Sequence, residues 1–96
     1  MNLRLIIKSV TGRLQHHLTP VSSTMFKRNE LGEALYSESD VEARVLVGDK
    51  EYVLEVDGDQ LLVFEGGQLL TAVRLSPIGQ AVERVCEVVL LHSRQS

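Results

Sequence analysis

The chain has 96 residues, of which 44 % are hydrophobic and 24 % are charged, and its formal net charge is −3. This length predicts one domain, because two halves would each be too small to bury a stable core. The ordinary composition argues against a disordered chain and excludes a collagen-like one. The single cysteine excludes an internal disulfide framework, and the longest apolar runs, of about four residues, are far short of the roughly 20 that span a membrane.

The first predicted elements are two strands over residues 2–10 and 13–18, joined as a hairpin. Apolar residues of the first strand recur with a period of two, which is typical of a strand with one wet face; they are Leu3, Leu5 and Ile7. Gly12 lies at the expected turn, where glycine readily adopts a positive φ. On this interpretation Ile6 points outward.

The next segment allows more than one interpretation. Residues 21–28 fit a third short strand, and Asn29 fits the N-cap of a short helix over 30–36. Residues 37–40 are polar and fit a connector. A strand, a helix and a mobile loop all remain open for residues 19–40.

The middle of the chain predicts an antiparallel meander of four strands. Turn signals recur every eight to ten residues, at Gly48, Gly58 and the pair Gly66-Gly67. Between these turns, apolar and polar residues alternate in the first two segments, whereas the last two are apolar on both faces and predict strands covered on both sides. The four predicted strands lie near 41–47, 51–57, 61–65 and 69–75.

A C-terminal amphipathic helix is predicted over 77–91. Ser76 suits the N-cap and Pro77 the first helical position, and apolar residues then recur at spacings of three and four. A shorter helix followed by a strand over 86–92 is the alternative, because β-branched residues lower helix propensity. The predicted fold class is α+β: a mainly antiparallel sheet, formed by the meander and the N-terminal hairpin, with one C-terminal helix packed on it.

The sequence carries no recognisable catalytic, metal or cofactor motif. His16 and His17 would point to opposite faces of a strand and could not share one ion. Cys86 lies in a valine-rich stretch, where a buried thiol is inert. We therefore expect no enzyme, no bound metal or cofactor and no small-molecule substrate.

The leading functional prediction is a non-enzymatic protein-interaction module that self-associates as a homodimer. An outward sheet face that mixes apolar and charged residues favours such contacts; the predicted contact residues are Arg44, Leu46, Glu51, Val53 and Glu55. Acidic residues around this face would attract a basic partner; they are Glu42, Glu51, Glu55 and Asp57.

Nucleic-acid binding is the alternative prediction, because the charge is unevenly distributed. The first 30 residues carry five basic residues and one acidic residue, and the remainder carries five basic and twelve acidic. The candidate phosphate contacts are Lys8, Arg13, Lys27 and Arg28. A sequence pI near 5.5 and only four aromatic residues weigh against this alternative.

An enzyme with a site at the seam between subunits, using Cys86 or a histidine, is the third hypothesis. Arg4 and Lys8 interrupt the apolar N-terminus, so we predict no export signal and a cytoplasmic location without membrane contact.

Overall fold

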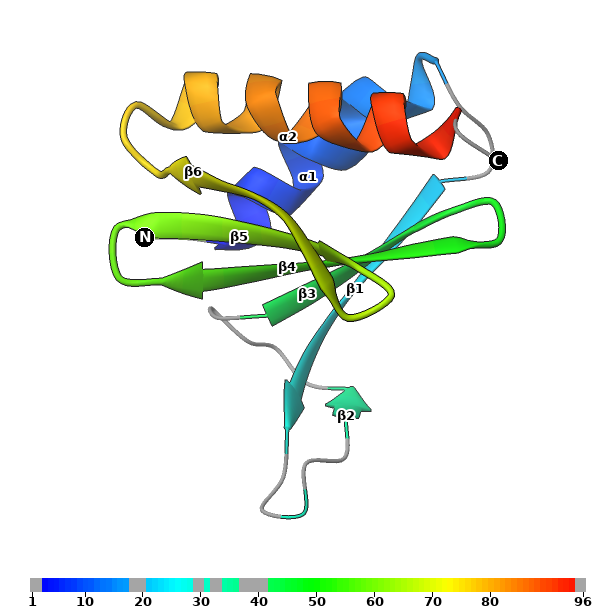
Figure 1. Ribbon diagram of the computed structural model, residues 1–96, viewed down its shortest axis with the longest axis vertical. Helices are drawn as coiled ribbons and strands as arrows, with labels where there is room; N and C mark the ends of the chain where they lie inside the picture. The colour runs from blue at the N-terminus through cyan, green and yellow to red at the C-terminus, as the bar shows by residue number, and fades with distance from the viewer. Residues whose placement is uncertain (1–2, 18–20, 29–30, 32–33, 37–41, 95–96) are drawn as a thin grey trace.

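A six-stranded antiparallel sheet forms one layer of the molecule, and two helices form the other (Figure 1). The structure is a computed structural model that describes residues 3–17, 21–28, 31, 34–36 and 42–94. The strand order is β2-β1-β3-β4-β5-β6, which confirms the α+β class with an antiparallel sheet. In chain order the elements are α1 (Leu3–Gln15), β1 (Val21–Arg28), β2 (Ala34–Tyr36), β3 (Glu42–Val47), β4 (Lys50–Asp57), β5 (Gln60–Glu65), β6 (Gln68–Arg74) and α2 (Ile78–Ser93).

Strands β3 to β6 form the predicted meander, each paired with the next along the chain. Gly58 has a φ of 62°, a left-handed conformation that suits glycine, and it lies in the turn between β4 and β5. The expectation that the last two strands, β5 and β6, are covered on both faces is wrong, because both helices lie on one face of the sheet and no described element packs on the other. Strand β6 is an edge of the described sheet, and Leu69 at its start is 50 % exposed.

The predicted N-terminal hairpin is wrong, because residues 3–15 form helix α1. The helical period explains the burial better than a period of two does; the buried residues of α1 are Leu3, Ile6, Ile7, Val10 and Leu14. Ile6, expected outward, is fully buried, whereas Leu5, expected inward, is 59 % exposed. Gly12 lies inside the helix and does not have a positive φ.

The segment after α1 contributes two strands to the sheet. Strand β1 confirms the predicted third strand and pairs with both β2 and β3. The predicted helix over 30–36 is wrong at its end, because Ala34–Tyr36 is strand β2 and its backbone pairs with β1. Asn29, its expected N-cap, and the expected connector over 37–40 lie outside the described residues.

Helix α2 confirms the C-terminal helix and excludes the alternative strand over 86–92. The N-cap is Pro77, not Ser76 as expected, and no side chain caps the first turn. At the other end, the Lys50 ammonium of β4 donates a hydrogen bond to the His92 carbonyl oxygen at 2.8 Å. A cation is favourable at this end, because the last carbonyls of a helix lack partners within the helix.

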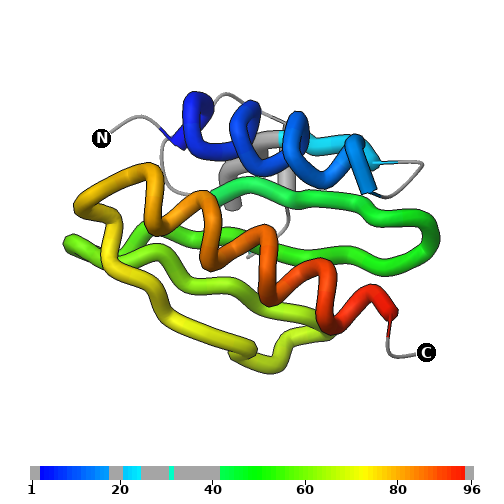
Figure 2. The backbone as a smooth tube through the Cα atoms, turned by 90° about the horizontal axis from the view of Figure 1, so that it is seen from above, coloured from blue at the N-terminus to red at the C-terminus, as the bar shows by residue number. Residues whose placement is uncertain are grey.

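Both helices lie on the same face of the sheet, which we call the inner face (Figures 1 and 2). Helix α1 contacts β1 and β3, α2 contacts β6, and the two helices contact each other. The core fills the space between the layers, and its inward sheet residues include Ala43, Val45, Tyr52, Leu54, Leu61 and Val63. Within the described part of the chain, neither helix has the length and apolar character needed to cross a bilayer.

Candidate functional site

The five predicted contact residues lie together on the sheet face opposite the helices, which we call the outer face. Side chains alternate between the two faces of a strand, and burial alternates along β3 so that Ala43, Val45 and Val47 face the core. Their neighbours therefore face outward. Register pairs Arg44 with Val53 and Leu46 with Glu51 across β3 and β4, with Glu55 two residues beyond Val53.

The apolar part of the outer face continues from β4 across β5. Val53 pairs with Phe64, and Glu55 pairs with Leu62. Leu69 of β6 pairs with Phe64, beyond an irregularity in the register between Val63 and Phe64. Cross-strand neighbours are close enough for their side chains to contact each other. The apolar residues among them therefore form a continuous strip across three strands; they are Val53, Leu62, Phe64 and Leu69.

A shallow hollow of about 520 Å³ lies on this face. Its lining combines the apolar side chains of Val53 and Phe64 with carboxylates and with the open backbone of Gly67; the carboxylates belong to Glu42, Glu51 and Glu55. We call these six residues the outer hollow. A second hollow of about 400 Å³ adjoins it and shares Glu51, Val53 and Gly67.

Carboxylates dominate the charge around the outer hollow. Glu42 and Glu55 are directly opposite each other in the β3–β4 register, an arrangement of like charges that destabilises a sheet. Arg44 balances part of this charge, with its Nε 3.2 Å from Oε1 of Glu51. The outer hollow therefore offers an apolar floor in a negative setting.

The four basic residues predicted as phosphate contacts are not brought to one place. Lys8 and Arg13 lie on α1, in the helix layer. Lys27 and Arg28 are the last residues of β1, in the sheet, at the end that pairs with β2 and projects away from the helices (Figure 1). The structure thus divides the predicted basic surface between two layers.

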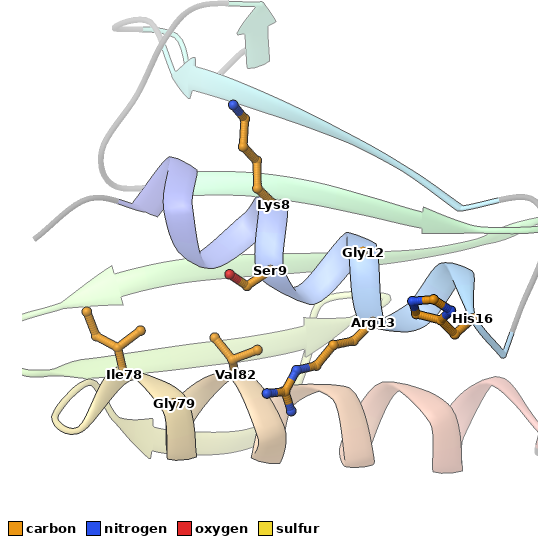
Figure 3. Close-up of a pocket in the computed structure, with 8 residues that line it drawn as sticks. All are labelled: Lys8, Ser9, Gly12, Arg13, His16, Ile78, Gly79 and Val82. Atoms are coloured by element: carbon orange, nitrogen blue, oxygen red, sulfur yellow. The ribbon is translucent and has the colours of Figure 1, made fainter.

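The sequence analysis missed a groove between α1 and α2, which we call the helix groove (Figure 3). Its volume is about 390 Å³, and it is lined by Lys8, Ser9, Gly12, Arg13, His16, Ile78, Gly79 and Val82. The predicted hairpin over residues 2–18 gives no sign of this groove, because only a helix brings Ser9, Gly12 and Arg13 to the same side of the element. The spacing of Ile6, Val10 and Leu14 was the signal that could have revealed α1.

The lone cysteine is buried, as the sequence predicts, and it lies between the two helices, a position that the sequence did not predict. Cys86 Sγ donates a weak hydrogen bond to the Val10 carbonyl oxygen at 3.8 Å. Burial raises the pKa of the Cys86 thiol, although the positive charge of Arg13 opposes part of this rise. A thiol in this setting is a poor nucleophile, because the thiolate is the reactive form.

Comparison with known proteins identifies no relative of this chain. No protein-family model matches the chain, and neither a curated protein nor a solved structure matches it.

Proposed function

We propose that this chain is a non-enzymatic protein-interaction module that binds its partner through the outer face of the sheet. The observation that carries the proposal is an apolar floor of Val53 and Phe64 on a face where no described element packs. Both side chains are half-buried, so part of their apolar surface is open to a partner. Apolar surface within a polar rim is typical of protein contact sites.

The chemistry of the outer hollow favours a partner segment that presents lysine or arginine beside apolar side chains. The alkyl stem of a basic side chain can cover Val53 while its charged head reaches Glu51 or Glu55. An arginine head can also lie over the Phe64 ring, an interaction of about 0.5–2 kcal/mol. Opposite charges would also speed the encounter of the two proteins.

A second copy of the chain, bound face to face, is the competing occupant of the outer hollow. The carboxylates around the hollow disfavour this arrangement. Stacking two outer faces would bring two sets of carboxylates toward each other, because each face carries Glu42, Glu51 and Glu55, and like charges brought together repel. The homodimer predicted from the sequence stays a prediction. We favour the basic partner because it relieves this repulsion rather than increasing it.

The setting of the one thiol in the chain supports the non-enzymatic part of the proposal. Cys86 is buried between the helices with a raised thiol pKa, and a catalytic thiol needs access and a lowered pKa. Among the described residues, no cluster of three His, Cys, Asp or Glu side chains is placed to hold a metal. An enzyme at a subunit seam stays a hypothesis, as does the cytoplasmic location.

The test titrates the isotope-labelled full chain with a soluble peptide of alternating lysine and leucine, followed by amide chemical shifts. We expect saturable shifts centred on Val53 and Phe64. Glu55→Lys should weaken binding about tenfold through lost attraction, and Val53→Ser should do so through lost apolar burial. The matched control is Glu83→Lys, the same charge change at an exposed position on α2.

Two outcomes would overturn the proposal. If Glu83→Lys weakens binding as much as Glu55→Lys, the peptide senses net charge and not the outer hollow. If light scattering finds a dimer that persists at low and high salt, and Val53→Ser dissociates it, the occupant is a second copy. We expect a monomer at both salt concentrations.

Nucleic-acid binding remains the second prediction, through Lys8, Arg13, Lys27 and Arg28. The division of these residues between helix layer and sheet gives it less support than the outer face has. Its test is the salt dependence of binding to a DNA duplex and its loss in the double variant Lys27→Glu with Arg28→Glu. Binding unaffected by this double variant would remove that assignment.

A further inference from the structure

The helix groove is a second concave surface, on the opposite side of the molecule from the outer hollow. It runs between α1 and α2, with side chains from both helices along its walls (Figure 3). Its volume of about 390 Å³ lies in the range of small-ligand sites. Nothing in the proposed function uses it.

The α1 side of the groove is cationic. Helix α1 contains no acidic residue, and no acidic residue lines the groove. Neither Lys8 nor Arg13 forms an ion pair with a residue that the structure describes. Figure 3 shows the Arg13 side chain extending from α1 toward α2, with Ser9 on the same side of α1. The groove therefore presents donors without an internal counter-charge.

The α2 side of the groove is apolar. Ile78 and Val82 point from α2 toward α1 in Figure 3, and Ile78 is 44 % exposed although it is a large apolar residue. Gly12 and Gly79 leave open space, since a Cβ at either position would meet no atom within 4 Å. A ligand in the groove would therefore meet donors on one wall and hydrocarbon on the other.

We propose that the helix groove binds a phosphate monoester of a small apolar alcohol. The phosphate lies against Arg13 and the Ser9 hydroxyl, with His16 beside Arg13, and the apolar group lies on the exposed side chain of Ile78. A phosphate has several acceptor oxygens for these donors, and a guanidinium matches its geometry. The site is independent of the outer hollow, so each proposal can fail without the other.

The test is an amide chemical-shift titration of the full chain with phenyl phosphate. The expected result is saturable shifts at Gly12 and Gly79, whose amides report on both walls. Inorganic phosphate lacks the apolar group and benzyl alcohol lacks the charge, so each should bind at least about tenfold more weakly. Equal affinity for phenyl phosphate and inorganic phosphate, or no shifts at these glycines, would overturn the proposal.

Variants distinguish a loss of ligand binding from a loss of folding. Arg13→Gln removes the guanidinium and should weaken phenyl phosphate binding about tenfold. Gly12→Leu should abolish binding by filling the groove, yet keep the fold, because a Cβ at this position meets no atom within 4 Å and leucine favours a helix more than glycine does. The matched control is Arg84→Gln, an exposed arginine on α2 that pairs with Glu87 away from the groove. A loss with Arg84→Gln as large as that with Arg13→Gln would overturn the assignment.

The same phosphate chemistry is presented by lipid headgroups, and one further arm distinguishes the two sources. Phosphatidylcholine vesicles containing phosphatidic acid are mixed with the chain and sedimented. We expect the chain to stay in the supernatant, because the groove takes a free ester. Co-sedimentation that Arg13→Gln abolishes, without binding of phenyl phosphate, would overturn the free-ester proposal in favour of a membrane lipid.

Discussion

The two faces of the sheet are formed by the same strands but have different surroundings. The inner face is sealed by α1 and α2, and among the described residues no charged side chain is buried there. The outer face mixes Val53 and Phe64 with carboxylates, and no described element packs on it. The inner face thus accounts for the described core, whereas Val53 and Phe64 lie on the face outside it.

The strongest test of this contrast uses two neighbours on β4. Leu54 is fully buried on the inner face, and Val53 faces outward. We expect Leu54→Ala to lower the free energy of unfolding by about 2–5 kcal/mol, through lost burial and a cavity. Val53→Ala should lower it by about 1 kcal/mol or less. Urea denaturation of both variants measures the difference, and equal losses would mean that the outer face is covered too.

A second test uses the phenol of Tyr52 on the inner face. Tyr52 is fully buried, and burial, followed by the neighbouring Glu65 carboxylate, raises the pKa of its hydroxyl well above the ordinary value. Above about pH 10 the unfolded chain therefore loses this proton while the folded chain keeps it. The free energy of unfolding should then fall as the pH rises.

The matched variant for this pH dependence is Tyr52→Phe, which keeps the ring and removes the titrating group. Urea midpoints measured between pH 8 and pH 11 should fall less steeply in Tyr52→Phe than in the original chain. Cys86 also has a raised thiol pKa, but it is present in both proteins and cancels in the comparison. Identical slopes would show that Tyr52 does not titrate differently on folding.

The smallest expected effect belongs to a charge pair on the outer face. Arg44 and Glu51 are 3.2 Å apart, and their side chains are 38 % and 47 % exposed. Such pairs contribute about 0.2–1 kcal/mol, since water and salt screen the charges. A double-mutant cycle with Arg44→Gln and Glu51→Gln isolates this coupling. A value well above 1 kcal/mol would show that the outer face is drier than the sheet geometry implies.

The meander and the outer face could be predicted from the sequence because both follow from local rules. Alternation places Val53 and Glu55 on one face whatever covers the other, and the glycine at position 58 marks a turn that needs a positive φ. The pairing of the strands then followed, because each strand of the meander pairs with the next along the chain. The five predicted contact residues therefore lie where expected, while their binding function stays a prediction.

Helix α1 and the helix groove could not be predicted in the same way. Leu3 and Ile7 fit an alternating strand and an amphipathic helix equally well, and Leu5 then favoured the strand. The groove depends on the packing of α1 against α2, which no local pattern encodes. Ile6, Val10 and Leu14, spaced by four, were the residues that distinguished the helix from the strand.

The contact between the first and last helices also sets an order for folding during synthesis. Val10 and Cys86, joined across this contact, are 76 residues apart. The strands of the meander pair with near neighbours and can form early, since short loops close at a small entropic cost. Until α2 leaves the ribosome, however, the apolar stripe of α1 lacks the helix that it packs against, and the inner side of β6 lacks its cover. Nascent chains halted before α2 should therefore be the aggregation-prone form of this protein.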